Sequence, residues 1–191
     1  MAKSVGPRGS ARTRVIEAAL ALFAEHGVNG TSLQMIADHL GVSKASVYYQ
    51  FHSKDDIVLA VIRPVFADFD QLATEVETKE VGRARQAAAI AGFVELAVRH
   101  RQVTAVFYRD PAIDTLVNSH PECSAINQRL RTVLGLDGAD IETRVTMSLV
   151  ISGIYGSAMD PELQDIPDDE LHRILLQCAG RLVPADEAIR R

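Results

Sequence analysis

Residues 43–51 bring together side chains that can bind a nucleic-acid duplex. The segment contains Lys44, Ser46, Tyr48 and Tyr49 and carries few charges. The major groove of DNA admits one α-helix and offers base-edge acceptors, thymine methyl groups and flanking phosphates to such side chains. Taken alone, the same residues also fit half-buried core tyrosines beside a solvated lysine. The neighbouring residues favour the duplex, because they predict a helix presented by a tight turn.

The preceding residues predict a short helix followed by that turn. Apolar residues recur on one face of a 3.6-residue period over residues 32–40, so we expect an amphipathic helix there. Thr31 and Gln34 stand at the spacing of a capping box at its start. Gly41 ends the helix, since glycine enters a left-handed C-cap without steric cost, and Ser43 can cap the next one. The pattern predicts a helix-turn-helix.

The second helix of this pair is expected to turn its polar side outward. Val47 and Phe51 are four residues apart and face inward. The residues left to point outward or sideways are Lys44, Ala45, Ser46, Tyr48, Tyr49 and Gln50. A broad apolar stripe over residues 15–23 predicts a first helix that ends at Gly27 and packs beneath the pair. Ser53 is expected to cap a fourth helix.

Length, composition and charge predict a globular chain of one or two domains. The 191 residues are 47% hydrophobic and 24% charged, which suits a substantial core and argues against disorder. The net charge is -5, but residues 1–54 carry six basic against three acidic side chains, a net +3, so the remainder carries -8. A basic N-terminal segment in an otherwise acidic chain favours the approach of this segment to phosphates.

Other function classes find little support in the sequence. No signal-type apolar stretch opens the chain, and the longest uncharged stretch, residues 145–159, is broken by Ser, Thr and Gly. We therefore expect a cytoplasmic protein without a membrane segment. Cys123 and Cys178 lack metal-ligand spacing and are expected to be reduced, although a thiol sensor stays open. The common catalytic and phosphate-loop motifs are missing, so we expect neither an enzyme nor a cofactor.

Three motifs within residues 11–57 form one further pattern: Arg12-x-Arg14-Val-Ile-x-Ala-Ala-Leu20-x-Leu-Phe23, Gly30-Thr31-Ser-Leu-x-x-Ile-Ala-x-x-Leu-Gly41-Val-Ser43 and Val47-Tyr48-Tyr49-x-Phe51-x-Ser-Lys54. In these motifs the chain resembles the tetracycline-repressor (TetR) family of bacterial transcriptional regulators. The resemblance implies an all-α homodimer of about nine helices. An N-terminal three-helix helix-turn-helix domain would bind a double-stranded DNA operator, and a C-terminal helical domain would bind an effector and dimerise.

Resemblance and predicted geometry together assign roles within the expected DNA-binding domain, residues 1–57. Base edges or thymine methyl groups would be met by Lys44, Ser46 and Tyr48. Gln34 could reach a base or a phosphate from the preceding helix. Phosphates would be held by Thr31, Tyr49 and Lys54, the last from a helix N-terminus. Gln50 departs from the histidine or asparagine that the family often has there, which puts a phosphate contact from this position in doubt.

The remaining residues, 58–191, are expected to form the effector-binding and dimerisation domain. They sustain neither strand-type alternation nor a repeat, so the predicted fold class is all-α. Two recognition helices are needed for tight binding, and we expect a homodimer through the last helices, at about residues 140–159 and 168–182. The side chains proposed for this interface are Ile141, Val145, Leu149, Ser152, Gly153, Gly156, Leu171, Ile174, Leu175, Cys178 and Leu182. The alternative is that they form only intrachain core.

An unknown, largely apolar small molecule is the expected effector, bound in an apolar cavity. The candidate contacts, each of which also fits plain core, are Phe66, Phe69, Phe93, Phe107, Tyr108, Met147, Ile151 and Tyr155. Such a ligand would release a repressor from a palindromic operator by favouring a dimer whose recognition helices are wrongly spaced. A sequence does not distinguish a repressor from an activator. The alternative function is a helical small-molecule-binding enzyme or carrier with an appended DNA-binding head.

Overall fold

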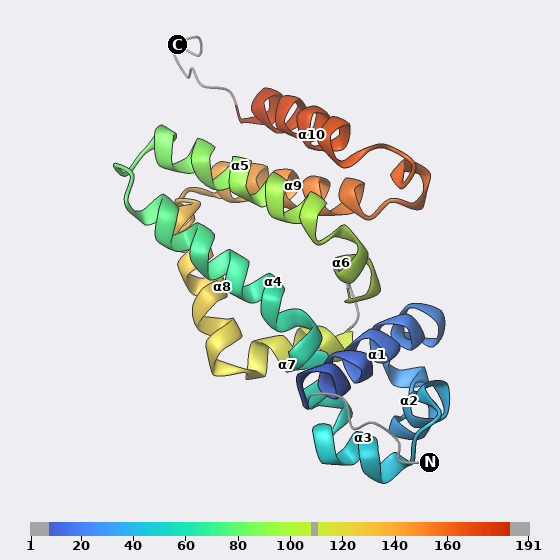
Figure 1. The fold of residues 1–191 in the computed structure, drawn as a ribbon. Coiled ribbons are helices and arrows are strands. Elements are labelled where there is room, and N and C mark those ends of the chain that lie inside the picture. Colours follow the sequence, from blue (N-terminus) through green and yellow to red (C-terminus); the bar gives the residue numbers. More distant parts are fainter. Residues whose placement is uncertain (1–7, 108–110, 184–191) are drawn as a thin grey trace, which may run out of the picture. The chain divides into compact units, whose positions relative to one another are not determined.

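The computed structural model describes residues 8–107 and 111–183, and this part of the chain contains ten α-helices, one short 3-10 helix and no strand (Figure 1). The expected all-α fold is confirmed for the described residues. The helices are α1 (Arg8–Gly30), α2 (Leu33–Leu40), α3 (Lys44–Gln50), α4 (Lys54–Glu77), α5 (Arg83–Arg99), α6 (Arg101–Phe107), α7 (Pro111–Ser119), α8 (Pro121–Val133), α9 (Ile141–Ala158) and α10 (Asp168–Leu182).

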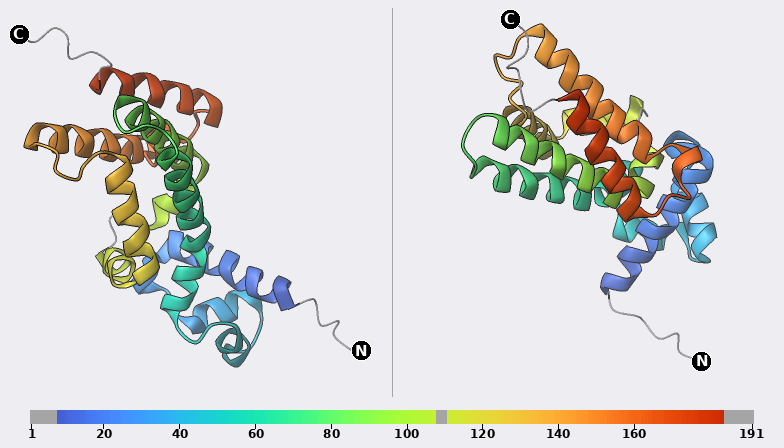
Figure 2. Two further views of the ribbon diagram at one scale, coloured as in Figure 1. Left: turned by 90° about the vertical axis from the view of Figure 1, so that its left-hand side faces the viewer. Right: turned by 90° about the horizontal axis from the view of Figure 1, so that it is seen from above.

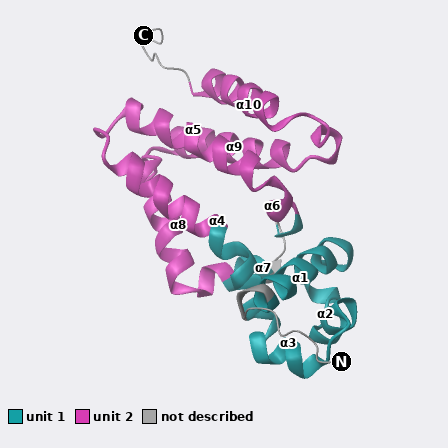
Figure 3. Cartoon of the chain, in the orientation of Figure 1, with its two compact units in different colours: residues 1–64, 106–116 teal, residues 65–105, 117–191 magenta. Residues whose placement is uncertain are grey.

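The chain divides into two compact units, which Figure 3 shows in two colours. Unit 1 comprises residues 1–64 and 106–116, and unit 2 comprises residues 65–105 and 117–191. The division falls within α4, directly after Pro64. The boundary that the sequence suggests, between residues 57 and 58, stays a prediction of where the DNA-binding domain ends.

Unit 1 is built around the apolar stripe of α1, against which α2 and α3 pack. The stripe buries Ala19 and Phe23, and the two short helices contribute Ile36 and Val47, each 1% exposed or less. Phe107 also belongs to this unit, and its ring meets the edge of the Phe23 ring at a centroid distance of 6.0 Å. The first helix therefore carries most of the apolar surface on which the two short helices rest.

In unit 2, α5 is the central helix and packs on α8, α9 and α10 (Figures 1 and 2). Its buried residues include Phe93 and Val94, which share one core with Met147 of α9 and Leu171 of α10. Gly92 lets α5 approach α4, because a Cβ built at this position would overlap the side chain of Leu72. Because α5 is buried on several sides, the second half of its sequence consists almost entirely of apolar residues.

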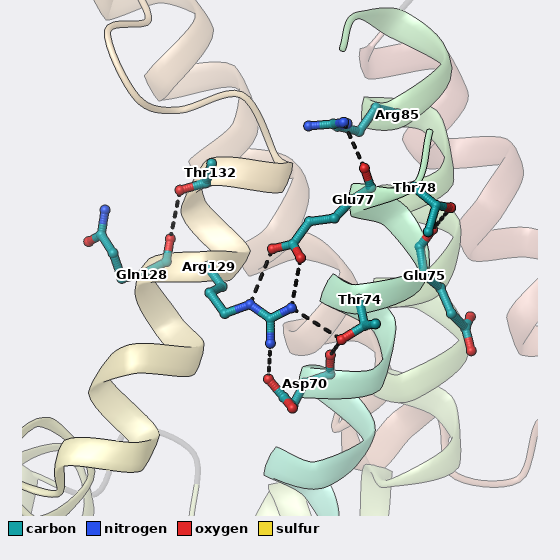
Figure 4. Close-up of polar contacts among 9 residues, drawn as sticks. All are labelled: Asp70, Thr74, Glu75, Glu77, Thr78, Arg85, Gln128, Arg129 and Thr132. Carbon is teal, nitrogen blue, oxygen red and sulfur yellow. Dashed lines mark hydrogen bonds and ion pairs between the residues drawn. The ribbon is translucent and has the colours of Figure 1, made fainter. Parts of the chain in front are cut away.

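A cluster of charged and polar side chains links α8 to α4 (Figure 4). Arg129 of α8 donates through Nε and Nη2 to the two carboxylate oxygens of Glu77, at 3.1 and 2.8 Å. Its Nη2 also lies 3.1 Å from Thr74 Oγ1, and its Nη1 contacts the carboxylate of Asp70. The hydrogen bond from Arg129 holds the pKa of Glu77 below its ordinary value of 4.5. A planar guanidinium suits this geometry, since it can satisfy several acceptors at once.

A second polar link joins α5 to α4 at Asp68. His100 Nε2 lies 2.8 Å from Asp68 Oδ2, and Arg99 Nη1 lies 3.3 Å from the same oxygen. The hydrogen bond from His100 lowers the pKa of Asp68. Polar contacts thus hold α4 to both α5 and α8, in addition to the packing of its apolar face.

We expect R129Q to lower the free energy of unfolding by about 1 kcal/mol at neutral pH, as for a well-oriented surface ion pair. The difference from the wild type should shrink as pH falls below 4.5, because Glu77, whose pKa is lower in the folded state, then becomes protonated and loses this contribution. Chemical denaturation at several pH values checks both statements. R131Q, at an exposed position of the same helix, is the control, and an R129Q effect that does not depend on pH would contradict the assignment.

Candidate nucleic-acid interface

The turn between α2 and α3 is fixed by short-range hydrogen bonds. Gly41 adopts a left-handed conformation with φ of 64° and ends α2, as expected. Ser43 caps α3, since its Oγ accepts a hydrogen bond from the Ser46 amide at 3.2 Å. Ser53 and Asp56 form a reciprocal capping box at the start of α4, with distances of 3.0 and 2.9 Å. Local sequence therefore determines where α3 begins and where the next helix starts.

The start of α2 differs from the prediction. Its N-cap is Ser32, whose Oγ accepts from the Met35 amide at 3.2 Å, and not Thr31. Thr31 is 2% exposed, and its hydroxyl donates toward the carbonyl oxygens of Gly27 and Leu22 at 2.9 and 3.2 Å. A buried hydroxyl directed at the end of α1 cannot also hold a phosphate, so the predicted phosphate contact from Thr31 is wrong. Thr31 is a structural residue.

Helix α3 exposes the side chains that the sequence analysis assigns to DNA. Tyr48 and Tyr49 are 52% and 72% exposed, whereas the residue before them, Val47, is fully buried and anchors the helix. The other exposed residues of this surface are Lys44, Ala45 and Ser46. Ser46 Oγ lies 2.9 Å from Ser43 Oγ, where either oxygen can donate. The structure thus brings five of the predicted contacts together on one short helix.

The remaining predicted contacts have partners inside the protein. Gln34 is exposed, but its side-chain amide donates to Asp38 Oδ1 at 2.8 Å. Lys54 is half-buried, and its Nζ donates to the carbonyl oxygens of Val28 and Thr31 at 2.6 and 3.1 Å. An ammonium has three donors, so one donor of Lys54 is left for a phosphate. Lys54 therefore connects α4 to the last turn of α1 and to Thr31, which follows α1.

Two residues beside this surface were not singled out from the sequence. The ring of His52 is exposed and meets the edge of Tyr48 at a centroid distance of 5.4 Å. Arg12 of α1 donates through Nη1 to the carbonyl oxygen of Gln50 at 2.9 Å, while Gln50 itself is half-buried. His52 follows the predicted helix directly in sequence, and this position could have indicated that it lies beside the α3 surface. Nothing in the local pattern around Arg12 indicates a contact 38 residues away.

The effector candidates separate into different environments. Phe69, Phe93 and Tyr155, from α4, α5 and α9, form an aromatic cluster with centroid distances of 5.4 to 6.5 Å. Met147 is buried in the same core and its Sδ accepts from Gln86 Nε2 at 3.5 Å, and Ile151 packs against that core. The candidates on α4 also include Phe66, which is half-buried.

Two further effector candidates are not part of this cluster. Phe107 was expected among the effector contacts, but it pairs with Phe23 in unit 1 and is not part of the aromatic cluster of unit 2, so its effector contact stays a prediction. Its helix, α6, ends in unit 1, which the sequence pattern did not indicate. Tyr108 lies outside the described residues.

Helix α9 has a buried face and an exposed apolar face. Ile141, Val145 and Leu149 are 77%, 53% and 65% exposed. With them lie Ser152, Gly153 and Gly156, all exposed, and a Cβ built at either glycine would meet no atom within 4 Å. We call these six residues the α9 stripe.

On α10 the expected interface is only partly at the surface. Cys178 and Leu182 are exposed and Ile174 is half-buried. Leu171 and Leu175 are buried in the core of unit 2, so their assignment to an interface is wrong. The mutual packing of α5, α9 and α10 requires an apolar face of α10, and these two leucines supply it.

Neither a metal-binding cluster nor a membrane-spanning helix occurs within residues 8–107 and 111–183. No group of three or more His, Cys, Asp or Glu side chains in these ranges is placed to hold a metal ion. None of the helices described is long and apolar enough to cross a membrane.

The described residues are helical, and α2 and α3 form a helix-turn-helix whose second helix presents a polar and aromatic surface. These features place the protein in the class of helix-turn-helix proteins. Residues 15–61 match the family model described as bacterial regulatory proteins, tetR family. Over this N-terminal segment the chain is similar to the tetR family of bacterial regulatory proteins, as the resemblance suggests.

Individual relatives agree with this assignment. The transcriptional repressor KstR2 of Mycobacterium tuberculosis is 31% identical over 133 residues, which cover 68% of this chain and 64% of KstR2. The transcriptional regulator RutR of Escherichia coli is 37% identical over 67 residues, which cover 33% and 32% of the two chains. The chain thus spans less than two thirds of the length of either relative. The solved structure of KstR2 shares the fold, with a TM-score of 0.68 at 20% identity over 95% of this chain and 96% of that one.

We expect K54M to lower the free energy of unfolding by about 1 to 2 kcal/mol, because it removes two hydrogen bonds from a charged donor and leaves two carbonyl groups without them. K44M, a change of the same type at an exposed position of the same unit, should alter it by less than about 0.5 kcal/mol. Thermal and denaturant unfolding followed by circular dichroism measure both. Equal stability of the two variants would show that the Lys54 contacts contribute nothing.

Proposed function

We propose that this protein is a sequence-specific DNA-binding transcriptional regulator that reads a palindromic operator as a homodimer. The observation that carries the proposal is the exposure of Tyr48 and Tyr49 on a helix anchored by buried Val47. Exposing two large aromatic side chains in water is unfavourable unless a partner covers them. The major groove of a duplex is a partner of the right width for one helix.

The chemistry of the exposed side chains suits such a duplex. Lys44 and Ser46 lie in the first turn of α3, from which recognition helices commonly contact base edges. Tyr48 would pack on thymine methyl groups or bases, and Tyr49 would donate its hydroxyl to a phosphate. Gln34 can reach the duplex by exchanging its bond with Asp38 for one to DNA. The basic balance of residues 1–54 favours approach to the duplex by this end.

We expect the wild-type chain to select a palindromic duplex from a random-sequence library and to bind it roughly a thousandfold more tightly than an unselected duplex. Y49A should weaken binding to both duplexes, since a phosphate contact carries no sequence information. K44A and S46A should change which duplexes are selected. Fluorescence anisotropy and repeated selection measure these effects.

The matched control for these variants is V81A, at a position of unit 2 that is 85% exposed and outside the α3 surface. It should bind DNA as the wild type does. Indifference of the wild-type chain to every duplex in the library would refute the proposal and favour the alternative, a helical small-molecule-binding enzyme or carrier.

The proposed dimer interface is the α9 stripe, extended by Leu182 of α10. Single exposed hydrophobic residues are ordinary on a protein surface, but a continuous row of them along one helix indicates a partner. The small residues at positions 152, 153 and 156 would let a second helix approach closely. A second copy of the same helix fits such a row because a two-fold interface pairs a surface with itself. Two recognition helices about 34 to 36 Å apart would then meet successive turns of the major groove.

We expect L149E to convert the dimer into a monomer, because a two-fold axis through the α9 stripe would bring the new carboxylates close together in an apolar interface. Affinity for the selected palindrome should fall by about a hundredfold or more, since bivalent binding is lost. Sedimentation equilibrium and anisotropy measure these changes. V81E introduces the same charge at an exposed position outside the α9 stripe and should remain dimeric, and a dimeric L149E would exclude this interface.

For regulation we propose that a small, largely apolar effector releases the repressor from its operator. The support is the aromatic cluster of Phe69, Phe93 and Tyr155, which joins three helices of unit 2. A ligand that inserts between these rings would have to move the helices that carry them. It acts only if it binds the released state more tightly than the DNA-bound state. Met147 and Ile151 are the further contacts that lie against the same core.

A further inference from the structure

Arg12 lies against the C-terminal end of α3, although it belongs to α1. Its Nη1 donates to the carbonyl oxygen of Gln50, the last residue of α3, at 2.9 Å. Its guanidinium carbon lies 4.0 Å from the centre of the Phe51 ring, and Phe51 is the C-cap of the same helix. We refer to these two interactions as the Arg12 contact. It joins two consecutive residues of the recognition helix to the first helix of the domain.

Buried side chains hold α3 at Val47 and at its C-cap, Phe51, which is 2% exposed. The helix has seven residues, and Val47 is its one buried residue. Isolated helices of this length are not stable in water, so the orientation of α3 depends on the contacts at its two ends. Ser43 caps the first end. At the second end the final carbonyl groups have no partner within the helix, and a cation that binds one of them also complements the negative end of the helix dipole.

We propose that Arg12 is a positioning residue for DNA recognition, which holds the last turn of α3 so that Tyr48 and Tyr49 meet the duplex in one orientation. The inference rests on the proposed function of the α3 surface. Arg12 acts through Gln50 and Phe51, and its donor at Nη1 is directed at a carbonyl oxygen of the protein. Its planar group is suited to the task, since it can lie on an aromatic face and donate at its edge at the same time.

The test compares R12Q and R12K with R14Q as the matched control. Arg14 is exposed on the same helix, two residues further along. The first measurement is amide hydrogen exchange of the DNA-free protein, read at Phe51, whose N–H donates to the Val47 carbonyl at 3.0 Å. R12Q should speed this exchange by about tenfold, since it removes two moderate contacts, whereas R14Q should leave it within about twofold of the wild type. This readout does not involve DNA.

The second measurement is binding to the palindromic duplex that the wild-type chain selects and to an unselected duplex, each at several salt concentrations. R12Q should lower affinity for the selected duplex by about tenfold and for the unselected one by less than about twofold, with the salt slope unchanged. R12K keeps the charge but not the planar group, so it should restore only part of the selective affinity. R14Q should affect both duplexes alike.

Two results would overturn the inference. The first is equal weakening of R12Q on both duplexes, with a salt slope reduced by about one and full recovery in R12K, since this is the behaviour of a phosphate ligand. The second is unchanged exchange at Phe51 in R12Q. A wild-type chain indifferent to duplex sequence would refute the proposed function itself, and the role in DNA recognition with it. The exchange measurement would then still show whether the Arg12 contact supports α3.

Discussion

The exposure of α3 is the constraint on which the rest of unit 1 depends. A helix that is to enter a groove must keep most of its side chains out of the protein core, and α3 buries Val47 alone. So short a helix has little intrinsic stability, and its fold must come from its neighbours. Polar contacts supply part of the stability of this unit. Thr31 and Lys54 bind carbonyl groups near the end of α1, and Arg12 binds the last carbonyl of α3.

Helix α9 of unit 2 differs from α3, because it carries apolar residues on two faces. One face of this helix supplies Met147, Val150 and Ile154 to the core, while the α9 stripe leaves apolar side chains in water. A helix with apolar residues around much of its circumference is expected to be buried on both sides. Within a single chain α9 is buried on one side, and the proposed homodimer would cover the other. The aromatic cluster lies on the core side.

Local features of unit 1 could be predicted well from the sequence. Gly41, Ser43 and Ser53 end or begin helices as expected, because caps depend on residues within one turn of each other. The placement of Thr31 could not be predicted. Thr31 and Ser32 are both good caps, and the choice between them depends on carbonyl groups of α1 that the local pattern does not contain. The pairing of Phe107 with Phe23 could not be predicted for a similar reason, since the two residues are far apart in sequence.

What the sequence determined alone is the helical class, the helix-turn-helix and the set of side chains that α3 presents, because periodicity and capping act over a few residues. Tertiary structure decided how those side chains are used. It engaged Thr31 and Lys54 in internal hydrogen bonds, placed Leu171 and Leu175 in the core, and left Leu149 exposed. The physical reason is that an apolar side chain or a hydrogen-bond donor has many possible partners along a chain. Only the packed fold selects one of them.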